Sequence, residues 1–212
     1  MRTLSGIYPT AWQPTPATPC ASRAHHGAGH RYDAGFAEKG STLVAHPLVD
    51  QLRFARSEFR RCLAGVSQED AATRLLPMNS LGWIICHLAG QERRFWFIWA
   101  QGITDVAPEL NEWGHFEKPA NTPPLDGAWA AWEAVTHAVD PFLDGLSQER
   151  LLEHLMVDGE PMESNIGTML RRSTYHYWFH TGEANAIRQL LGHANVPEFV
   201  GDIAKEAPYR PE

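Results

Sequence analysis

The longest helical pattern in the chain lies near its C-terminal end and reads NIGTMLRRSTYHYWFHTGEANAIRQLLG over residues 165–192. Apolar and small side chains recur there at steps of three and four residues, which is the period of an amphipathic helix. The helix is expected to begin near Asn165 and to continue to Leu191, with Gly192 as its C-terminal stop. At about 1.5 Å per residue it would be ~40 Å long. One side of this helix is apolar, so the stretch predicts packing against other helices.

Three further stretches carry the same helical period, at residues 47–64, 80–101 and 126–143. Between the second and the third, residues 102–124 contain four prolines and no clear period, which predicts a long crossover loop. No stretch shows the apolar and polar alternation that is typical of a strand. We therefore predict an all-α fold, a four-helix bundle with one long crossover loop.

Composition divides the chain into three parts. Residues 1–40 are rich in Pro, Ala, Gly, Thr and Ser, and carry four basic and two acidic side chains, a charge of +2. The whole chain has a formal charge of −7, so the remainder carries −9. The first part buries too little apolar surface to offset its ordering entropy, and we expect a disordered or poorly packed N-terminal tail. The bundle is expected over residues 41–193, followed by a short tail over residues 194–212.

Composition also excludes several classes of function. A pI of about 5.9 argues against a protein that binds nucleic acid through charge. No run of ~20 apolar residues exists, so no membrane-spanning segment is expected. Three cysteines without paired spacing, and an N-terminus without the apolar core of a signal peptide, favour a cytoplasmic protein.

Eleven histidines make imidazole the main candidate for chemistry. His176 and His180 are four residues apart, so both project from the inward face of the last predicted helix. His87 lies on an inward stripe of the 80–101 helix. Three neutral imidazoles could hold a divalent metal and leave coordination positions open, as catalytic metal sites do. Spacing alone favours this interpretation no more than its alternative, in which three separate core histidines bind backbone carbonyls or tyrosines.

Two segments resemble a known family. Residues 79–92, NSLGWIICHLAGQE, are similar to the second helix of the DinB / YfiT-like metalloenzymes, and residues 176–192, HYWFHTGEANAIRQLLG, to their last long helix. That family also includes thiol-dependent S-transferases and a maleylpyruvate isomerase. The resemblance implies a four-helix bundle, commonly dimeric, with a three-histidine metal site whose ligands map onto His87, His176 and His180.

Three further polar side chains are candidates for a catalytic role. Glu183, three residues after His180, is placed either to hold a ligand imidazole through its second N–H or to pair along the helix surface. Gln91, one turn beyond His87, is placed to approach the metal or its water. Glu92 is close in sequence but not on quite the same face. Four neighbouring arginines are expected to be solvated rather than to bind an anionic substrate: Arg93, Arg94, Arg171 and Arg172.

The resemblance implies a divalent-metal-dependent enzyme, most directly a transferase that acts with a low-molecular-weight thiol. A free thiol has a pKa near ~8.5, and a bound dication favours the nucleophilic thiolate at neutral pH. The residues do not distinguish mycothiol, bacillithiol and glutathione. Two alternatives stay open: a metal-dependent hydrolase with Glu92 or Glu183 as general base, and a non-catalytic, metal-binding, stress-related helical bundle.

The expected cofactor is a divalent transition metal. Zinc or nickel is favoured, and iron, manganese and cobalt also tolerate imidazole and oxygen donors. A low-molecular-weight thiol is the expected cosubstrate. The expected partners are a small-molecule substrate and a second copy of the chain in a homodimer, without nucleic acid or membrane.

Overall fold

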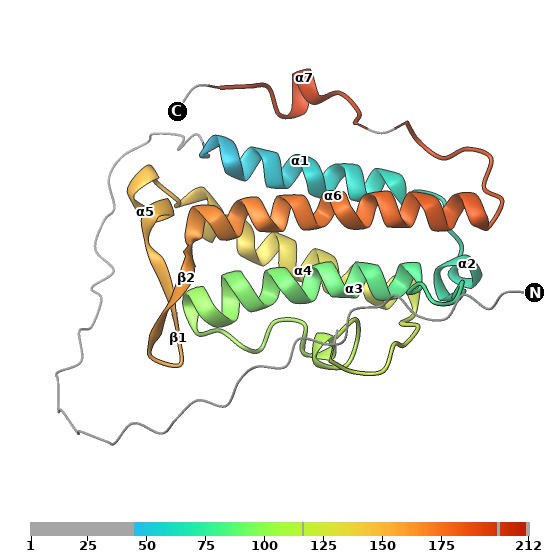
Figure 1. The fold of residues 1–212 in the computed structure, drawn as a ribbon, viewed down its shortest axis with the longest axis horizontal. Helices are drawn as coiled ribbons and strands as arrows, with labels where there is room; N and C mark the ends of the chain where they lie inside the picture. Colours follow the sequence, from blue (N-terminus) through green and yellow to red (C-terminus); the bar gives the residue numbers. More distant parts are fainter. Residues whose placement is uncertain (1–44, 116, 199, 211–212) are drawn as a thin grey trace, which may run out of the picture. The chain divides into compact units, whose positions relative to one another are not determined.

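A computed structural model describes residues 45–115, 117–198 and 200–210. The tail expected over residues 1–40 lies outside these ranges. Four long helices form the body of the described chain (Figure 1): α1 (Pro47–Cys62), α3 (Leu81–Glu92), α4 (Leu125–Asp144) and α6 (Ile166–Leu190). Helix α1 packs against α6, and α3 packs against both α4 and α6. The predicted all-α four-helix bundle is therefore confirmed.

Shorter elements join the long helices. They are α2 (Gln68–Ala72), the π-helix η1 (Arg93–Trp99), the 3-10 helix η2 (Pro108–Asn111), α5 (Gln148–Leu152), β1 (His154–Val157), β2 (Glu160–Asn165) and α7 (Ile203–Glu206). No helix among the described residues is both long and apolar enough to cross a membrane.

Side-chain caps fix where α3 and α6, the helices that carry His87, His176 and His180, begin. The side chain of Asn165 accepts a hydrogen bond from the backbone N–H of Thr168 at 2.8 Å, which starts α6 at the predicted place. Ser80 does the same for α3 by accepting from the N–H of Trp83 at 3.2 Å. Each cap satisfies a donor that the first helical turn leaves unpaired.

The four long helices share one apolar core. Fully buried side chains come from each of them, including Leu52 of α1, Ile84 of α3, Val135 of α4 and Leu170 of α6. Burying a side chain of this size contributes about 1.5–3 kcal/mol to folding. This core therefore fixes the distance between α3 and α6, on which the histidines lie.

The helix expected over residues 80–101 differs from the structure. The α-helix ends at Glu92 and continues as the wider π-helix η1. The side chain of Arg93, its first residue, is buried and donates to the carbonyls of Thr104 and Val106, each at 2.6 Å. Arg93 therefore attaches the crossover loop to the end of the helix, and π-type turns of this kind are frequent near functional sites.

A β-hairpin precedes α6, although the sequence shows no strand alternation. Strands β1 and β2 pair antiparallel, and Asp158 and Gly159 at the turn both have positive φ, 53° and 85°. That combination is the type I′ turn preferred by two-residue hairpins. The sequence pattern missed the strands because β2 is mostly polar, with Met162 only partly buried, and has no fully buried side chain.

The residues that follow α6 are not a free tail in the described range. Gly201 donates its N–H to a carboxylate oxygen of Glu58 on α1 at 2.7 Å, and Arg61 donates to the carbonyl of Glu198 at 2.5 Å. Arg210 forms an ion pair with Asp50. The segment that carries α7 therefore packs along α1 (Figure 1).

Candidate metal centre

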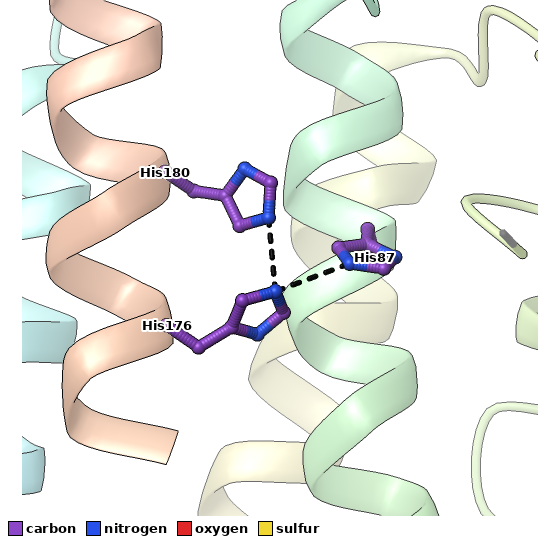
Figure 2. Close-up of side chains that lie close together, drawn as sticks. All are labelled: His87, His176 and His180. Carbon is purple, nitrogen blue, oxygen red and sulfur yellow. Dashed lines mark hydrogen bonds between the residues drawn. The ribbon is translucent and has the colours of Figure 1, made fainter. Parts of the chain in front are cut away.

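Three histidines meet between α3 and α6. His176 and His180 point from α6 toward His87 on α3 (Figure 2). The Nε2 atom of His176 lies 3.2 Å from Nε2 of His87 and 2.9 Å from Nε2 of His180. One ligand atom from each residue lies within 4.8 Å of the other two. The structure thus brings together the three histidines that the sequence singled out.

The opposite nitrogen of each ring faces an oxygen atom. Nδ1 of His87 lies 3.0 Å from the carbonyl oxygen of Gly114, Nδ1 of His176 lies 2.9 Å from Oε1 of Gln91, and Nδ1 of His180 lies 2.7 Å from Oε2 of Glu183. An oxygen of these kinds can only accept, so each Nδ1 carries the ring proton. When the three rings are neutral, their Nε2 lone pairs are therefore left facing one another.

This donor set fits a divalent transition metal. Three converging lone pairs repel one another unless a cation lies between them, and imidazole nitrogen is a preferred ligand of Zn²⁺ and its neighbours. An oxygen acceptor on the second nitrogen is also how proteins orient metal-binding histidines. In the alternative of three separate core histidines, each ring would bind a backbone carbonyl or a tyrosine, and within the described part of the chain only His87 among the three has such a partner at Nδ1, the carbonyl of Gly114.

Burial disfavours a proton as the cation between these rings. Burial, followed by the charge on neighbouring histidines, lowers the pKa of His87 to about 4 and the pKa of His176 to about 3, from an ordinary value of 6.5. Both rings therefore stay neutral at physiological pH, the state in which imidazole binds metal.

These low pKa values predict how the metal-free protein responds to acid. Between about pH 6.5 and pH 4 the unfolded chain takes up protons on His87 and His176 that the folded chain does not, so the free energy of unfolding falls as the pH falls through this range. In proton NMR of chelator-treated protein, we expect the ring signals of both residues to titrate below about pH 5. Titration of both signals at the ordinary histidine pKa would contradict this prediction.

The crossover loop reaches the cluster through Gly114. Its φ is +66°, and a Cβ at this position would lie 2.4 Å from the backbone nitrogen of His87. Only glycine allows this close approach. The approach is what brings the Gly114 carbonyl against the His87 ring, while Trp83 stacks on the same ring with centroids 4.5 Å apart.

Replacing this glycine is expected to displace the loop. We predict that Gly114→Ala lowers the free energy of unfolding in urea by about 2 kcal/mol or more, because the methyl group adds both backbone strain and a clash. The matched control is Gly182→Ala on the exposed side of α6, where a Cβ meets nothing within 4 Å. That control should stabilise the helix by up to ~1 kcal/mol. Equal free energies of unfolding of the two variants would show that the loop at Gly114 does not lie in close contact with the backbone of α3.

A cavity of about 620 Å³ opens beside the cluster. His87 and His176 line it together with residues from η1, the crossover loop and β2. A small molecule in this cavity would therefore lie against two of the three histidines. Cavities of this size, with mostly apolar walls and a few polar groups, are typical ligand sites.

The three polar candidates for a catalytic role, Gln91, Glu92 and Glu183, lie in different surroundings. Glu183 and Gln91 each contact an Nδ1 atom of the cluster and are placed to orient its rings, and Gln91 also lines the cavity. Glu92 is completely buried, pairs with Arg56, and accepts a hydrogen bond from Tyr177 at 2.7 Å. It does not line the cavity, which leaves it without access to a substrate.

Two groups that contact His87, the carbonyl of Gly114 and the ring of Trp83, were not predicted from the sequence. The carbonyl of Gly114 is a backbone group in an aperiodic loop, and no side-chain pattern marks it. The stacking of Trp83 on His87 has a signal, the four-residue spacing between them, but tryptophans at such spacing more often only fill a core.

Comparison with known proteins completes the description of the site. A protein-family model described as Mycothiol-S-transferase matches residues 47–192, more than half of the chain and a range that holds all three histidines. A search of curated proteins found no match.

Proposed function

The chain belongs to the mycothiol-S-transferase family, and on that basis we propose that it is a metal-dependent enzyme that joins an electrophile to the sulfur of mycothiol. His87, His176 and His180 are the proposed ligands of the metal. The observation that carries the proposal is the convergence of three histidine Nε2 atoms beside a cavity that His87 and His176 line. Three neutral imidazoles add no charge, so a site that holds a divalent ion keeps a net charge of +2. Zinc or nickel is the proposed metal.

A divalent ion bound there supplies a Lewis acid that lowers the pKa of a bound thiol. The protein's own groups perform the remaining tasks. Gln91, Glu183 and the carbonyl of Gly114 hold the three rings in one tautomer, with Nε2 free. The cavity wall binds the electrophile and excludes water from the sulfur.

The geometry supports thiol transfer better than hydrolysis. A hydrolase at this site would need a carboxylate positioned to take a proton from water. None of the described residues that line the cavity is acidic. Glu92 accepts a hydrogen bond from Tyr177, and Glu183 accepts one from Nδ1 of His180, on the side of the ring away from the other two histidines. The proposed oligomeric state is a homodimer and the proposed location is the cytoplasm, as expected from the sequence.

The proposed function is tested with purified, untagged protein loaded with zinc or nickel. Mycothiol and an aryl chloride activated by nitro groups are supplied, and thioether formation is followed by absorbance. We expect turnover with mycothiol, at least about tenfold slower turnover with glutathione, and loss of turnover on chelation that is reversed by added metal. Turnover that is unchanged by chelation would overturn the metal dependence, and no turnover with any thiol would overturn the transferase assignment.

A further inference from the structure

Two hollows meet at the histidine cluster. The cavity described above and a shallower hollow of about 460 Å³ share Gln91, Arg172 and His176 in their walls. Both therefore give access to the same side of the cluster.

The charge around these hollows is opposite to that of the chain. Their walls contain four arginines, Arg93, Arg94, Arg171 and Arg172, and no acidic residue among the part of the chain that the structure describes. The chain as a whole carries a formal charge of −7. A cleft lined by one sign of charge raises the local concentration of ligands of the opposite sign. The site therefore favours an anion.

The arginines differ in what they can offer a ligand. Arg93 is buried, and its donors are used by the crossover loop, including Oδ1 of Asn111 at 3.0 Å. The expectation that all four arginines are solvated is therefore wrong for Arg93. Arg172 is exposed at the point where the hollows meet, and it forms no ion pair with any described carboxylate. Its charge and that of Arg94 act on the rings of His176 and His87, respectively, so both guanidinium groups lie within electrostatic reach of the cluster.

Several of the side chains that line the larger cavity are apolar or aromatic. Phe95 and Trp99 stack with ring centroids 5.2 Å apart, and Trp113 and the buried Met169 also line the cavity. Flat aromatic surfaces bind planar apolar groups well. A single ligand in the cavity would thus meet an aromatic surface and a guanidinium group together.

We propose that the electrophile is an organic anion, with a planar apolar body against Trp99 and Trp113 and a carboxylate bound by Arg172, assisted by Arg94. The inference rests on the proposed function and names the substrate class for it. In the transfer, a carbon–sulfur bond forms between the electrophile and the thiol, the bond from that carbon to the leaving group breaks, and the thiol proton passes to solvent. Arg172 takes no part in these bond changes, and it determines which electrophile is held.

The binding test uses two probes that cannot react, dinitrobenzoate and the uncharged dinitrobenzamide. Their affinities for the metal-loaded protein are measured by quenching of tryptophan fluorescence, since Trp99 and Trp113 line the cavity. We expect the carboxylate to bind about tenfold more tightly than the amide. In Arg172→Gln this preference should disappear, with the affinity for the amide unchanged within about twofold.

The matched control is Arg150→Gln. Arg150 is also exposed on a helix, pairs with Glu153 at 3.2 Å and lines neither hollow, so its replacement should leave the preference intact. Equal affinity of the two probes for the unaltered protein would overturn the proposal. So would a preference that survives in Arg172→Gln, because the carboxylate would then be bound by the metal or by another group.

Chlorinated versions of the same probes separate this inference from the proposed function. With mycothiol, the carboxylate version should show about tenfold higher kcat/KM, again lost in Arg172→Gln. If the binding preference is present and neither compound is turned over, the anion site stands and the transferase assignment fails. If both compounds are turned over at equal kcat/KM without a binding preference, the transferase assignment stands and the anion site fails.

Discussion

His180→Ala is expected to reduce the affinity for the metal by more than about a hundredfold and to remove thiol transfer with it. His180 is the most buried of the three histidines proposed as ligands, and its Nε2 lies 2.9 Å from that of His176. Removal leaves two imidazoles, too few to retain a divalent ion against a chelator. Loss of a group that only orients a ligand already costs about 10–100-fold in affinity, so loss of a ligand should cost more.

The measurement is elemental mass spectrometry on untagged protein, followed by competition with a chelator of known affinity. We expect close to one metal ion per chain before substitution and almost none in His180→Ala. His137→Ala provides the matched control, because His137 is an exposed histidine on α4 outside the cluster. Thermal unfolding of the three metal-free proteins shows whether the fold is kept.

Two results would contradict the expected loss. Equal metal content in His180→Ala and in the control would place the ion elsewhere. Absence of metal from every protein, even after reconstitution, would leave a helical module whose three histidines are core residues.

The parts of the site that depend on helix geometry were predictable from the sequence. A side chain repeats its direction every three to four residues, so the spacing of His176 and His180 places both on one face, and the apolar neighbours on that face point it inward. The same reasoning placed His87 on the inward side of α3. Spacing within each helix could not show that the two helices face each other, and the family resemblance supplied that step.

The parts that depend on the backbone between helices were not predictable. The change from α3 to the π-helix η1 alters the direction of every side chain from Arg93 onward, and no residue pattern announces it. The role of the crossover loop depends on where Gly114 touches α3, which is a tertiary contact. Glu92 illustrates the same limit, because its distance in sequence from His87 did not reveal that its partners are Arg56 and Tyr177.

Those partners belong to a buried polar network that joins all four long helices. Arg56 of α1 donates from Nε to Oε1 of Glu92 on α3 at 2.8 Å and from Nη1 to Asp140 on α4 at 2.9 Å. Tyr177 of α6 donates to Glu92 and accepts from Nε1 of Trp132 at 2.8 Å. Because Tyr177 adjoins His176 in sequence, the network fixes the position of α6 against α3 at the level of the cluster.

Protonation within the network is well defined. Burial lowers the pKa of the Arg56 guanidinium, but the charge and hydrogen bond of Glu92 outweigh it and raise the pKa above its ordinary value. Burial, and then the charge of Glu92, raises the pKa of Tyr177 well above its ordinary value. At neutral pH the network therefore contains a charged guanidinium and a neutral phenol whose hydroxyl donates a hydrogen bond to Glu92.

Glu92→Ala is the substitution expected to cost the most stability. It leaves the guanidinium of Arg56, which is only 4% exposed, without its main counter-charge, and it leaves the Tyr177 hydroxyl without an acceptor. Breaking a buried pair from one side costs about 3–5 kcal/mol. We expect a decrease of this size in the free energy of unfolding, measured by urea denaturation of the metal-free protein.

Two controls separate the network from a general effect of losing a charge. Asp144→Ala removes one partner of a surface pair with Arg53, whose side chains are 48% and 31% exposed, and should cost less than about 1 kcal/mol. The double variant Arg56→Met with Glu92→Leu removes both buried charges, and should recover at least about half of the loss because no uncompensated charge remains. A cost for Glu92→Ala as small as that of Asp144→Ala would mean that water reaches the pair, and that the position of α6 against α3 depends on apolar packing alone.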